Sequence, residues 1–173
     1  PPSALRRRAQ SSTTPLRART HSSLGLAATE TAPTDTFADR AERHEGEGMT
    51  LLDDKGSCIH AGFCGAGGTY VWSLMEETGD VGTRALAMAM TERCPSGRLL
   101  YEVPGASTPV EPSMPKQVVL IPDGPIWLTG GIPVERSDGE PFETRTRTTL
   151  CRCGASGTKP LCDGAHADVG FEG

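Results

Sequence analysis

Residues 150–166 read Leu-Cys-Arg-Cys-Gly-Ala-Ser-Gly-Thr-Lys-Pro-Leu-Cys-Asp-Gly-Ala-His, and this segment carries the strongest structural signal in the chain. Cys151 and Cys153 are two positions apart, so a bent loop that contains glycine can turn both thiolates toward one centre. Cys162 and His166 are four positions apart, which predicts that they lie on one face of a short helix. Three thiolates and one imidazole suit either a zinc ion or a 2Fe–2S cluster.

Six cysteines in a chain with 21 glycines are also typical of a small secreted protein held together by disulfides. However, 173 residues exceed the length of most disulfide-dense modules, and the first residues do not form the apolar segment of a secretion signal. The Cys151-Arg152-Cys153 spacing is too tight for a comfortable disulfide between those two cysteines. We therefore expect metal ligands, and because zinc fingers rarely set Cys-x-Cys against Cys-x-x-x-His, an iron–sulfur cluster is favoured over structural zinc.

The segment resembles the CDGSH iron–sulfur domain, the mitoNEET-like family. The family pattern is met at eight positions: Cys151, Cys153, Ser156, Pro160, Cys162, Asp163, Gly164 and His166. Ala165 stands where Ser or Thr is common, and this position is not a ligand. The resemblance extends upstream to residues 124–131. It implies a 2Fe–2S cluster with the Cys-x-Cys pair on one iron and with Cys162 and His166 on the other.

A second group of cysteines lies in the middle of the chain: Cys58, Cys64 and Cys94. Ferredoxin-type sites carry Cys-x2-Cys-x2-Cys and a remote Cys-Pro, but here Ala61 stands at the central position. Three thiolates suit a 3Fe–4S cluster, or a 4Fe–4S cluster with an unusual fourth ligand. Residues 48–103 resemble the divergent mono-cluster 4Fe–4S domains of bacteria, in which Cys-x-His-x3-Cys and Cys-Pro-Ser-Gly recur. His60 is the candidate fourth ligand; the alternatives are that it donates a hydrogen bond to the cluster, or that the three cysteines are reduced and bind nothing.

The N-terminus contains an altered copy of the C-terminal motif. Residues 5–26 align without a gap with residues 150–171 and share Leu, Arg, Ser, Thr, Pro, His and Gly at matching positions. Arginines replace the ligand cysteines: Arg6, Arg8 and Arg17. Because guanidinium groups do not bind metals, residues 1–26 are predicted to be a degenerate, ligand-less CDGSH-like repeat. Members of the family dimerise, and we expect this repeat to take the place of a second copy.

Two other interpretations of the N-terminus remain open. The segment is rich in Arg, Ser and Thr and has no acid before Glu30, which is also typical of a mitochondrial transit peptide. A disordered tail is the other alternative. The chain begins with Pro1 and the copy lacks preceding strands, so we expect an N-terminal piece to be missing. The Arg, Ala and Gly bias is typical of GC-rich bacterial genes, which favours a bacterial cytoplasmic protein over a mitochondrial one.

The expected fold class is small α+β: a short-stranded β module with a cluster-binding loop and short helix, joined to a ferredoxin-like α+β module. The expected parts are a linker with a short helix over 27–47, the ferredoxin-like domain over 48–103, a linker over 104–116 and the CDGSH-type domain over 117–173. Within the first part, the short helix is expected over residues 35–45. A longer helix is expected over 81–93, with Leu86, Ala89 and Met90 on one face. Short strands are expected over 49–53, 99–103, 118–121, 126–128, 132–134 and 144–150, the first two paired with each other.

The net charge of −5 argues against a nucleic-acid-binding surface. No run of about 18 apolar residues is present, so no membrane-spanning helix is expected. The sequence contains neither a Gly-rich nucleotide loop nor a nucleophile–base arrangement, and we expect a carrier rather than an enzyme. The predicted function is electron transfer or iron–sulfur cluster transfer to a protein partner, by a monomer with an internal repeat or by a homodimer. The alternatives are a structural zinc protein and a redox-regulated enzyme subunit.

Overall fold

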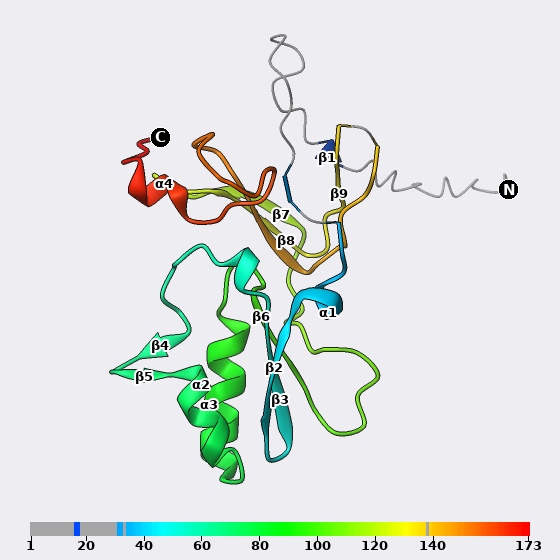
Figure 1. Cartoon of the computed structure of the whole chain (residues 1–173), viewed down its shortest axis with the longest axis vertical. Helices are drawn as coiled ribbons and strands as arrows, with labels where there is room; N and C mark the ends of the chain where they lie inside the picture. Colours follow the sequence, from blue (N-terminus) through cyan, green and yellow to red (C-terminus); the bar gives the residue numbers. More distant parts are fainter. Residues whose placement is uncertain (1–15, 18–30, 33, 138) are drawn as a thin grey trace, which may run out of the picture.

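The structure is a computed structural model that describes residues 16–17, 31–32, 34–137 and 139–173. Two lobes are stacked along the long axis, one formed by the middle of the chain and one by its C-terminal part (Figure 1). Helices and strands both occur, which confirms the expected α+β class. Apart from the two residues of one short strand, the N-terminal region predicted to be a repeat lies outside the described residues.

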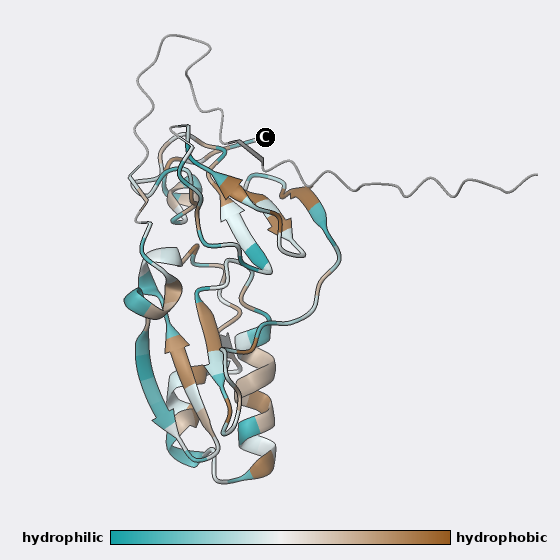
Figure 2. Cartoon of the chain, turned by 90° about the vertical axis from the view of Figure 1, so that its right-hand side faces the viewer, coloured by the Kyte–Doolittle hydropathy of each residue, from teal (hydrophilic) through white to brown (hydrophobic). Residues whose placement is uncertain are grey.

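A three-stranded antiparallel sheet organises the middle lobe, in the order β2–β3–β6. Its strands are β2 (Glu42–Gly46), β3 (Met49–Asp53) and β6 (Leu99–Glu102). Leu51 pairs with His44 on one side and with Tyr101 on the other, so the predicted pairing of the two apolar strands is confirmed. Figure 2 shows β2 as a hydrophilic edge strand beside the hydrophobic β3. Charged side chains on an edge strand discourage pairing with other chains.

Short elements connect β3 to the longest helix of the lobe, α3 (Val81–Glu92). They are η2 (Lys55–Ser57), β4 (Gly65–Ala66), β5 (Thr69–Tyr70), α2 (Val71–Leu74) and η3 (Met75–Glu77). At the start of α3, the carboxylate of Asp80 accepts a hydrogen bond from the N–H of Thr83 at 2.8 Å. None of the described helices is long and apolar enough to cross a membrane.

The buried face of α3 differs from the predicted one. Its buried residues are Ala87, Met90 and Thr91, whereas Leu86 and Ala89 are exposed. Residues three and four positions apart share a helix face, and Cys94 continues this stripe just beyond the helix end. Ala87, Met90 and Cys94 accordingly belong to one core cluster, together with Met49, Leu51, Val71, Met75, Leu99 and Tyr101. The orientation of the helix therefore places Cys94 on the core side of the lobe.

The helix expected over residues 35–45 is shorter than predicted. α1 contains only Phe37–Arg40, and the residues after it form β2 instead. The side chain of Phe37 is 2 % exposed and packs with Leu52 and Leu100, which point to the sheet face opposite Leu51. Pairing with β3 provides hydrogen bonds along one side of residues 42–46, and this pairing outweighs any local tendency to continue the helix.

The C-terminal lobe is built on a second antiparallel sheet, in the order β10–β8–β7. Its strands are β7 (Gln117–Leu120), β8 (Ile126–Thr129) and β10 (Arg147–Leu150). A separate pair is formed by β9 (Val134–Glu135) and β1 (Leu16–Arg17), which run parallel. The lobe ends in the short helix α4 (Ala165–Asp168). Leu128, Val134 and Phe142 form its core with Ala32.

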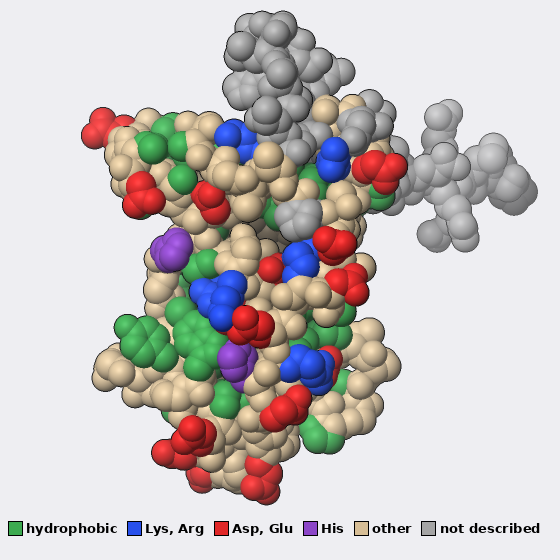
Figure 3. Space-filling view, in the orientation of Figure 1, with side chains coloured by type: hydrophobic (Ala, Val, Ile, Leu, Met, Phe, Trp, Pro, Cys, Tyr) green, Lys and Arg blue, Asp and Glu red, His purple; other side chains and the backbone are tan. Residues whose placement is uncertain are grey.

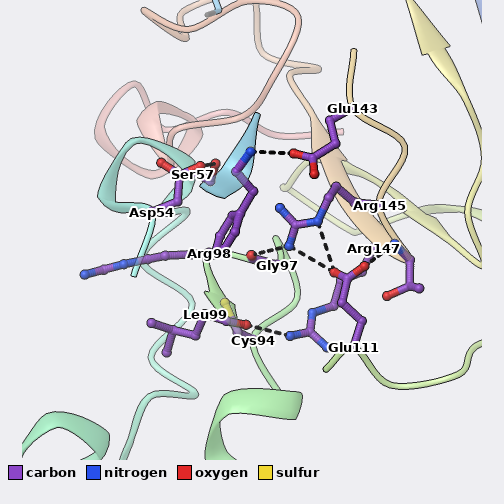
Figure 4. Close-up of polar contacts among 12 residues, drawn as sticks. Asp54, Ser57, Cys94, Gly97, Arg98, Leu99, Glu111, Glu143, Arg145 and Arg147 are labelled. Carbon is purple, nitrogen blue, oxygen red and sulfur yellow. Dashed lines mark hydrogen bonds and ion pairs between the residues drawn. The ribbon is translucent and has the colours of Figure 1, made fainter. Parts of the chain in front are cut away.

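Arginine side chains of the C-terminal lobe reach into the middle lobe (Figure 4). Arg147 is 1 % exposed and donates hydrogen bonds to three backbone carbonyls, those of Thr91 (3.1 Å), Glu92 (3.0 Å) and Leu99 (2.9 Å). Arg145 donates to the carbonyl of Gly97 at 3.0 Å. Two of the acceptors lie at the end of α3 and another begins β6. The lobes are therefore joined on both sides of the loop that carries Cys94.

We expect Arg147→Met to lower the free energy of unfolding by about 2–3 kcal/mol, because three carbonyls lose a charged donor. Arg43→Met is the matched control, since the Arg43 side chain is 52 % exposed and pairs with Glu102 on the surface. This control substitution should lower the free energy of unfolding by less than about 1 kcal/mol. Urea unfolding of both variants measures the difference. An equally small decrease in the free energy of unfolding in both would contradict the role of Arg147.

Candidate metal centres

The four residues predicted to bind metal in the C-terminal lobe form two close pairs. The Sγ atoms of Cys151 and Cys153 are 3.8 Å apart. The Sγ atom of Cys162 lies 3.4 Å from Nδ1 of His166. A tetrahedral metal with bonds of about 2.3 Å to sulfur and about 2.0–2.1 Å to nitrogen holds its ligand atoms roughly 3.5–3.8 Å apart. Each pair therefore has the spacing of two ligands on one metal ion.

Backbone pairing brings the distant ends of this motif together. The N–H of Cys151 donates to the carbonyl of Pro160 at 2.8 Å, and the N–H of Cys162 donates to the carbonyl of Thr149 at 2.9 Å. Leu150 and Leu161 form an antiparallel bridge between these bonds. The loop is thus closed at its base by a short ladder, which returns Cys162 to the end of β10 where Cys151 begins.

The prediction that Cys162 and His166 share a helix face is wrong. α4 begins only at Ala165, and the residue before it, Gly164, has a φ of 91°. This left-handed conformation is costly for residues with a Cβ and breaks any helix that starts at Cys162. Asp163 stabilises the turn, because its carboxylate accepts hydrogen bonds from the N–H groups of Ala165 (3.0 Å) and Gly157 (2.8 Å). The turn, rather than a helix face, sets the second pair.

The side chain of Cys162 is buried. Its residue is 2 % exposed, and burial raises the pKa of the thiol to about 11. Without a metal the group is therefore protonated at neutral pH, and metal binding must release that proton. Ser156, also buried, donates to the carbonyl of Leu161 at 2.7 Å and so supports the backbone that precedes Cys162.

The three cysteines of the middle lobe line one hollow of about 180 Å³. His60, Phe63, Pro95, Ser96 and Arg98 are among its other lining residues. A single water needs about 10–15 Å³ by the same measure, so the hollow has room for a polyatomic group. The structure thus places Cys58, Cys64 and Cys94 around one hollow that is large enough for a cluster. The three thiols do not meet at a single point, and across the described residues no three His, Cys, Asp or Glu side chains converge closely enough to hold one metal ion.

His60 lies beside the hollow in an unusual backbone conformation. Its φ is 56°, and its backbone N–H donates to Sγ of Cys58 at 3.4 Å. The residue is exposed and also lines the hollow. The backbone of His60 therefore acts as a donor to a thiol, and its imidazole stays a candidate ligand.

Sequence reasoning missed Arg98, which donates from Nη1 to Sγ of Cys58 at 3.0 Å. Asp53, whose side chain is fully buried, accepts from Nε and Nη2 of Arg98 at 2.6 and 2.8 Å. Asp53 raises the pKa of the guanidinium, which therefore stays charged. Trp72 donates to Asp53 at 3.1 Å, and its ring centroid lies 5.1 Å from the guanidinium carbon. The sequence offered one signal of this ion pair: an acidic residue, Asp53, is the last residue of the apolar strand Met49–Asp53.

Comparisons with known proteins agree with both groups of residues. Residues 123–167 match the family model described as "Iron-binding zinc finger CDGSH type". Residues 44–104 match the family model described as "Divergent 4Fe-4S mono-cluster". A search of curated proteins found no match to the chain. Both resemblances recognised from the motifs are confirmed, and each matched segment falls on one lobe.

In the iron-loaded protein, we expect Arg98→Gln to lower the reduction potential of the middle site by on the order of tens of millivolts, because a cationic donor to sulfur is lost. A potentiometric titration followed by electron paramagnetic resonance (EPR) measures the shift. Lys55→Gln is the matched control, since Lys55 lies three positions from Cys58 and pairs with Glu42 on the surface. Equal shifts in both variants would mean that net charge, not the N–H···S bond, sets the potential.

Proposed function

We propose that this chain, a fusion of a CDGSH-type segment and a divergent mono-cluster 4Fe–4S segment, carries electrons or iron–sulfur clusters to a protein partner. In this proposal Cys151, Cys153, Cys162 and His166 hold a 2Fe–2S cluster. Cys58, Cys64 and Cys94 hold a 3Fe–4S or 4Fe–4S cluster, with His60 as the candidate fourth ligand of the latter.

The observation that carries the proposal is the division of the C-terminal ligands into two pairs. Their separations of 3.8 and 3.4 Å suit two ligands on each of two metals. A 2Fe–2S cluster needs this arrangement, because each iron takes two protein ligands and shares two sulfides. The same donor set would suit zinc if all four atoms met at one point, so zinc is the competing outcome of the experiment below.

The residues of the C-terminal site have separate tasks in this proposal. A bound 2Fe–2S cluster supplies one-electron redox chemistry. Burial of Cys162 shields one side of the site from water, whereas the half-buried His166 must remain a neutral imidazole in order to bind. Replacing a thiolate by imidazole makes the ligand set less negative and raises the reduction potential, as in Rieske centres. Such a site is suited to accepting an electron and, when acidified, to releasing its cluster.

The middle site differs from the C-terminal site in the charge around its ligands and in the number of cysteines. Three thiolates are opposed by the guanidinium of Arg98, which the buried Asp53 keeps in place. The hydrogen bond to Cys58 supports a bound cluster by offsetting its negative charge. The room in the hollow suits a cluster of three or four irons better than one ion.

We propose a carrier rather than an enzyme because all six cysteines are engaged in the two sites, leaving no thiol as a nucleophile. The partner we propose is a redox protein or an acceptor of clusters. Figure 3 shows hydrophobic side chains on the side of the middle lobe where β4 and β5 lie. Phe63, which lines the hollow, is 52 % exposed there, and Tyr70 is 59 % exposed. Such side chains suit contact with another protein surface.

Metal and sulfide analysis of anaerobically purified protein tests the proposal. We expect about five or six iron atoms per chain with matching acid-labile sulfide and no zinc. Cys153→Ser should lose the two iron atoms of the C-terminal site, and Cys94→Ser should lose the three or four of the middle site. Stoichiometric zinc without sulfide would replace the proposed function with that of a structural zinc protein.

We expect the His166→Cys variant to retain the C-terminal cluster at a lower pH than the unsubstituted protein does. We also expect the reduction potential of this cluster to decrease. Imidazole is lost from iron when it is protonated, and an all-thiolate set is more negative. The visible absorbance of the cluster, followed during acid titration, measures its loss. His44→Gln, on β2 of the other lobe, is the matched control and should leave the acid stability unchanged. If His166→Cys lost its cluster at the same pH as the unsubstituted protein, the proposed role of His166 would be contradicted.

A further inference from the structure

The ligand-bearing loops of the two lobes are in direct contact. Gly164 lies between the ligands Cys162 and His166, and it packs against the two residues that follow Cys58. A Cβ added at Gly164 would lie 2.9 Å from Cδ2 of His60 and 3.1 Å from the carbonyl oxygen of Ile59. A side chain at Gly164 would therefore crowd the imidazole of His60 and the backbone of Ile59, and the glycine lets the two loops approach closely. In Figure 1 the loop between η2 and β4 passes next to α4.

A small cavity is lined by residues of both lobes, including one ligand of the C-terminal site and sequence neighbours of two middle-site cysteines. Its volume is about 40 Å³, and its lining includes Cys162 together with Ser57 and Ser96. Ser57 immediately precedes Cys58, and Ser96 lies two positions after Cys94. The thiol of the C-terminal site and the neighbours of two middle-site cysteines therefore border the same space.

A hydrogen-bonded route also links the two sites through the protein. The indole N–H of Trp127 donates to the carbonyl of Pro95 at 2.8 Å, and Pro95 follows Cys94 directly. Trp127 pairs with Thr149 in the sheet, and the carbonyl of Thr149 accepts the N–H of Cys162 at 2.9 Å. Cys94 and Cys162 are thus linked through the neighbouring strands β8 and β10, with one hydrogen bond at each end.

We propose that the two sites exchange one electron within a single chain, across the contact of Gly164 with Ile59 and His60. The inference rests on the proposed function, because it requires a cluster at each site. One site is oxidised by one electron while the other is reduced by one; no bond is broken, and the site of lower potential is the donor. A one-electron donor protein supplies the electron, and a one-electron acceptor protein removes it.

The structure supports exchange within the chain because the contact is held in place. Electron tunnelling slows steeply with distance, and here the two ligand loops touch. Arg147 donates to carbonyls before and after the Cys94 loop, and Arg145 donates to Gly97 within it, so hydrogen bonds join the lobes around this loop. Two independent carriers joined by a flexible linker need no such packing of one ligand loop on another.

EPR of the full chain tests the proposal without any partner. The sample is first shown by iron and sulfide analysis to contain both clusters, and is then poised where both are paramagnetic. We expect split or broadened signals that relax faster than those of Cys94→Ser and Cys153→Ser, each of which retains one cluster. A spectrum equal to the sum of the spectra of these two variants would overturn the proposal.

Flash reduction of the unsubstituted protein by a photoexcited flavin provides a measurement that does not depend on folding of the variants. We expect the electron to redistribute between the two clusters at a rate that is independent of protein concentration. A rate that rises in proportion to concentration would overturn the proposal, because it would mean exchange between chains.

The outcomes separate the two proposals. Protein without iron and sulfide overturns the proposed function and this inference together. Protein with a single loaded site overturns the inference and leaves a one-cluster carrier. Protein with both clusters but no magnetic interaction overturns only the inference.

Discussion

The structure depends on one buried guanidinium, that of Arg147, which links the two lobes. Taking a cation out of water is costly unless it finds hydrogen-bond acceptors, and here three backbone carbonyls accept from Nη1 and Nη2, whereas the buried Nε has no partner. Arg147 opens β10, whose end leads directly into Cys151, and two of its acceptors lie at the end of α3, just before Cys94. Arg147 therefore helps to hold both ligand groups in place, together with the bonds of Arg145 to Gly97 and of Trp127 to Pro95.

Charge is distributed differently around the two ligand groups. In the middle lobe, a buried carboxylate orients a guanidinium toward a thiol, so the polar network of Asp53, Arg98 and Trp72 is satisfied within itself. In the C-terminal lobe, a cluster bound as proposed would carry less negative charge because one of its four ligands is the neutral imidazole of His166. Both arrangements reduce the charge of a bound cluster, one by a neighbouring cation and one by a neutral ligand.

The local sequence predicted some features correctly and others wrongly, for identifiable reasons. Spacing predicted the ligand pairs, because a Cys-x-Cys loop and a Cys-x3-His turn restrict where their side chains can point. It misplaced Cys162 on a helix because periodicity does not reveal that Gly164 adopts a left-handed conformation. It also missed β2, since pairing with β3 outweighs the local helical tendency of residues 35–45. Arg98 was missed because its partner Cys58 lies 40 positions away.

The sequence by itself determined the chemistry of each site: which thiols and which imidazole are available, and in what spacing along the chain. It also determined the two apolar strands and the main helix, whose patterns are local. Only the tertiary structure decided that the two sites meet, that a guanidinium faces Cys58 and that Arg147 joins the lobes. The last two features depend on hydrogen bonds between residues 40 to 56 positions apart, and the first on the contact of Gly164 with His60. Such contacts form when buried polar groups must find partners in the folded chain, and no local spacing rule specifies those partners.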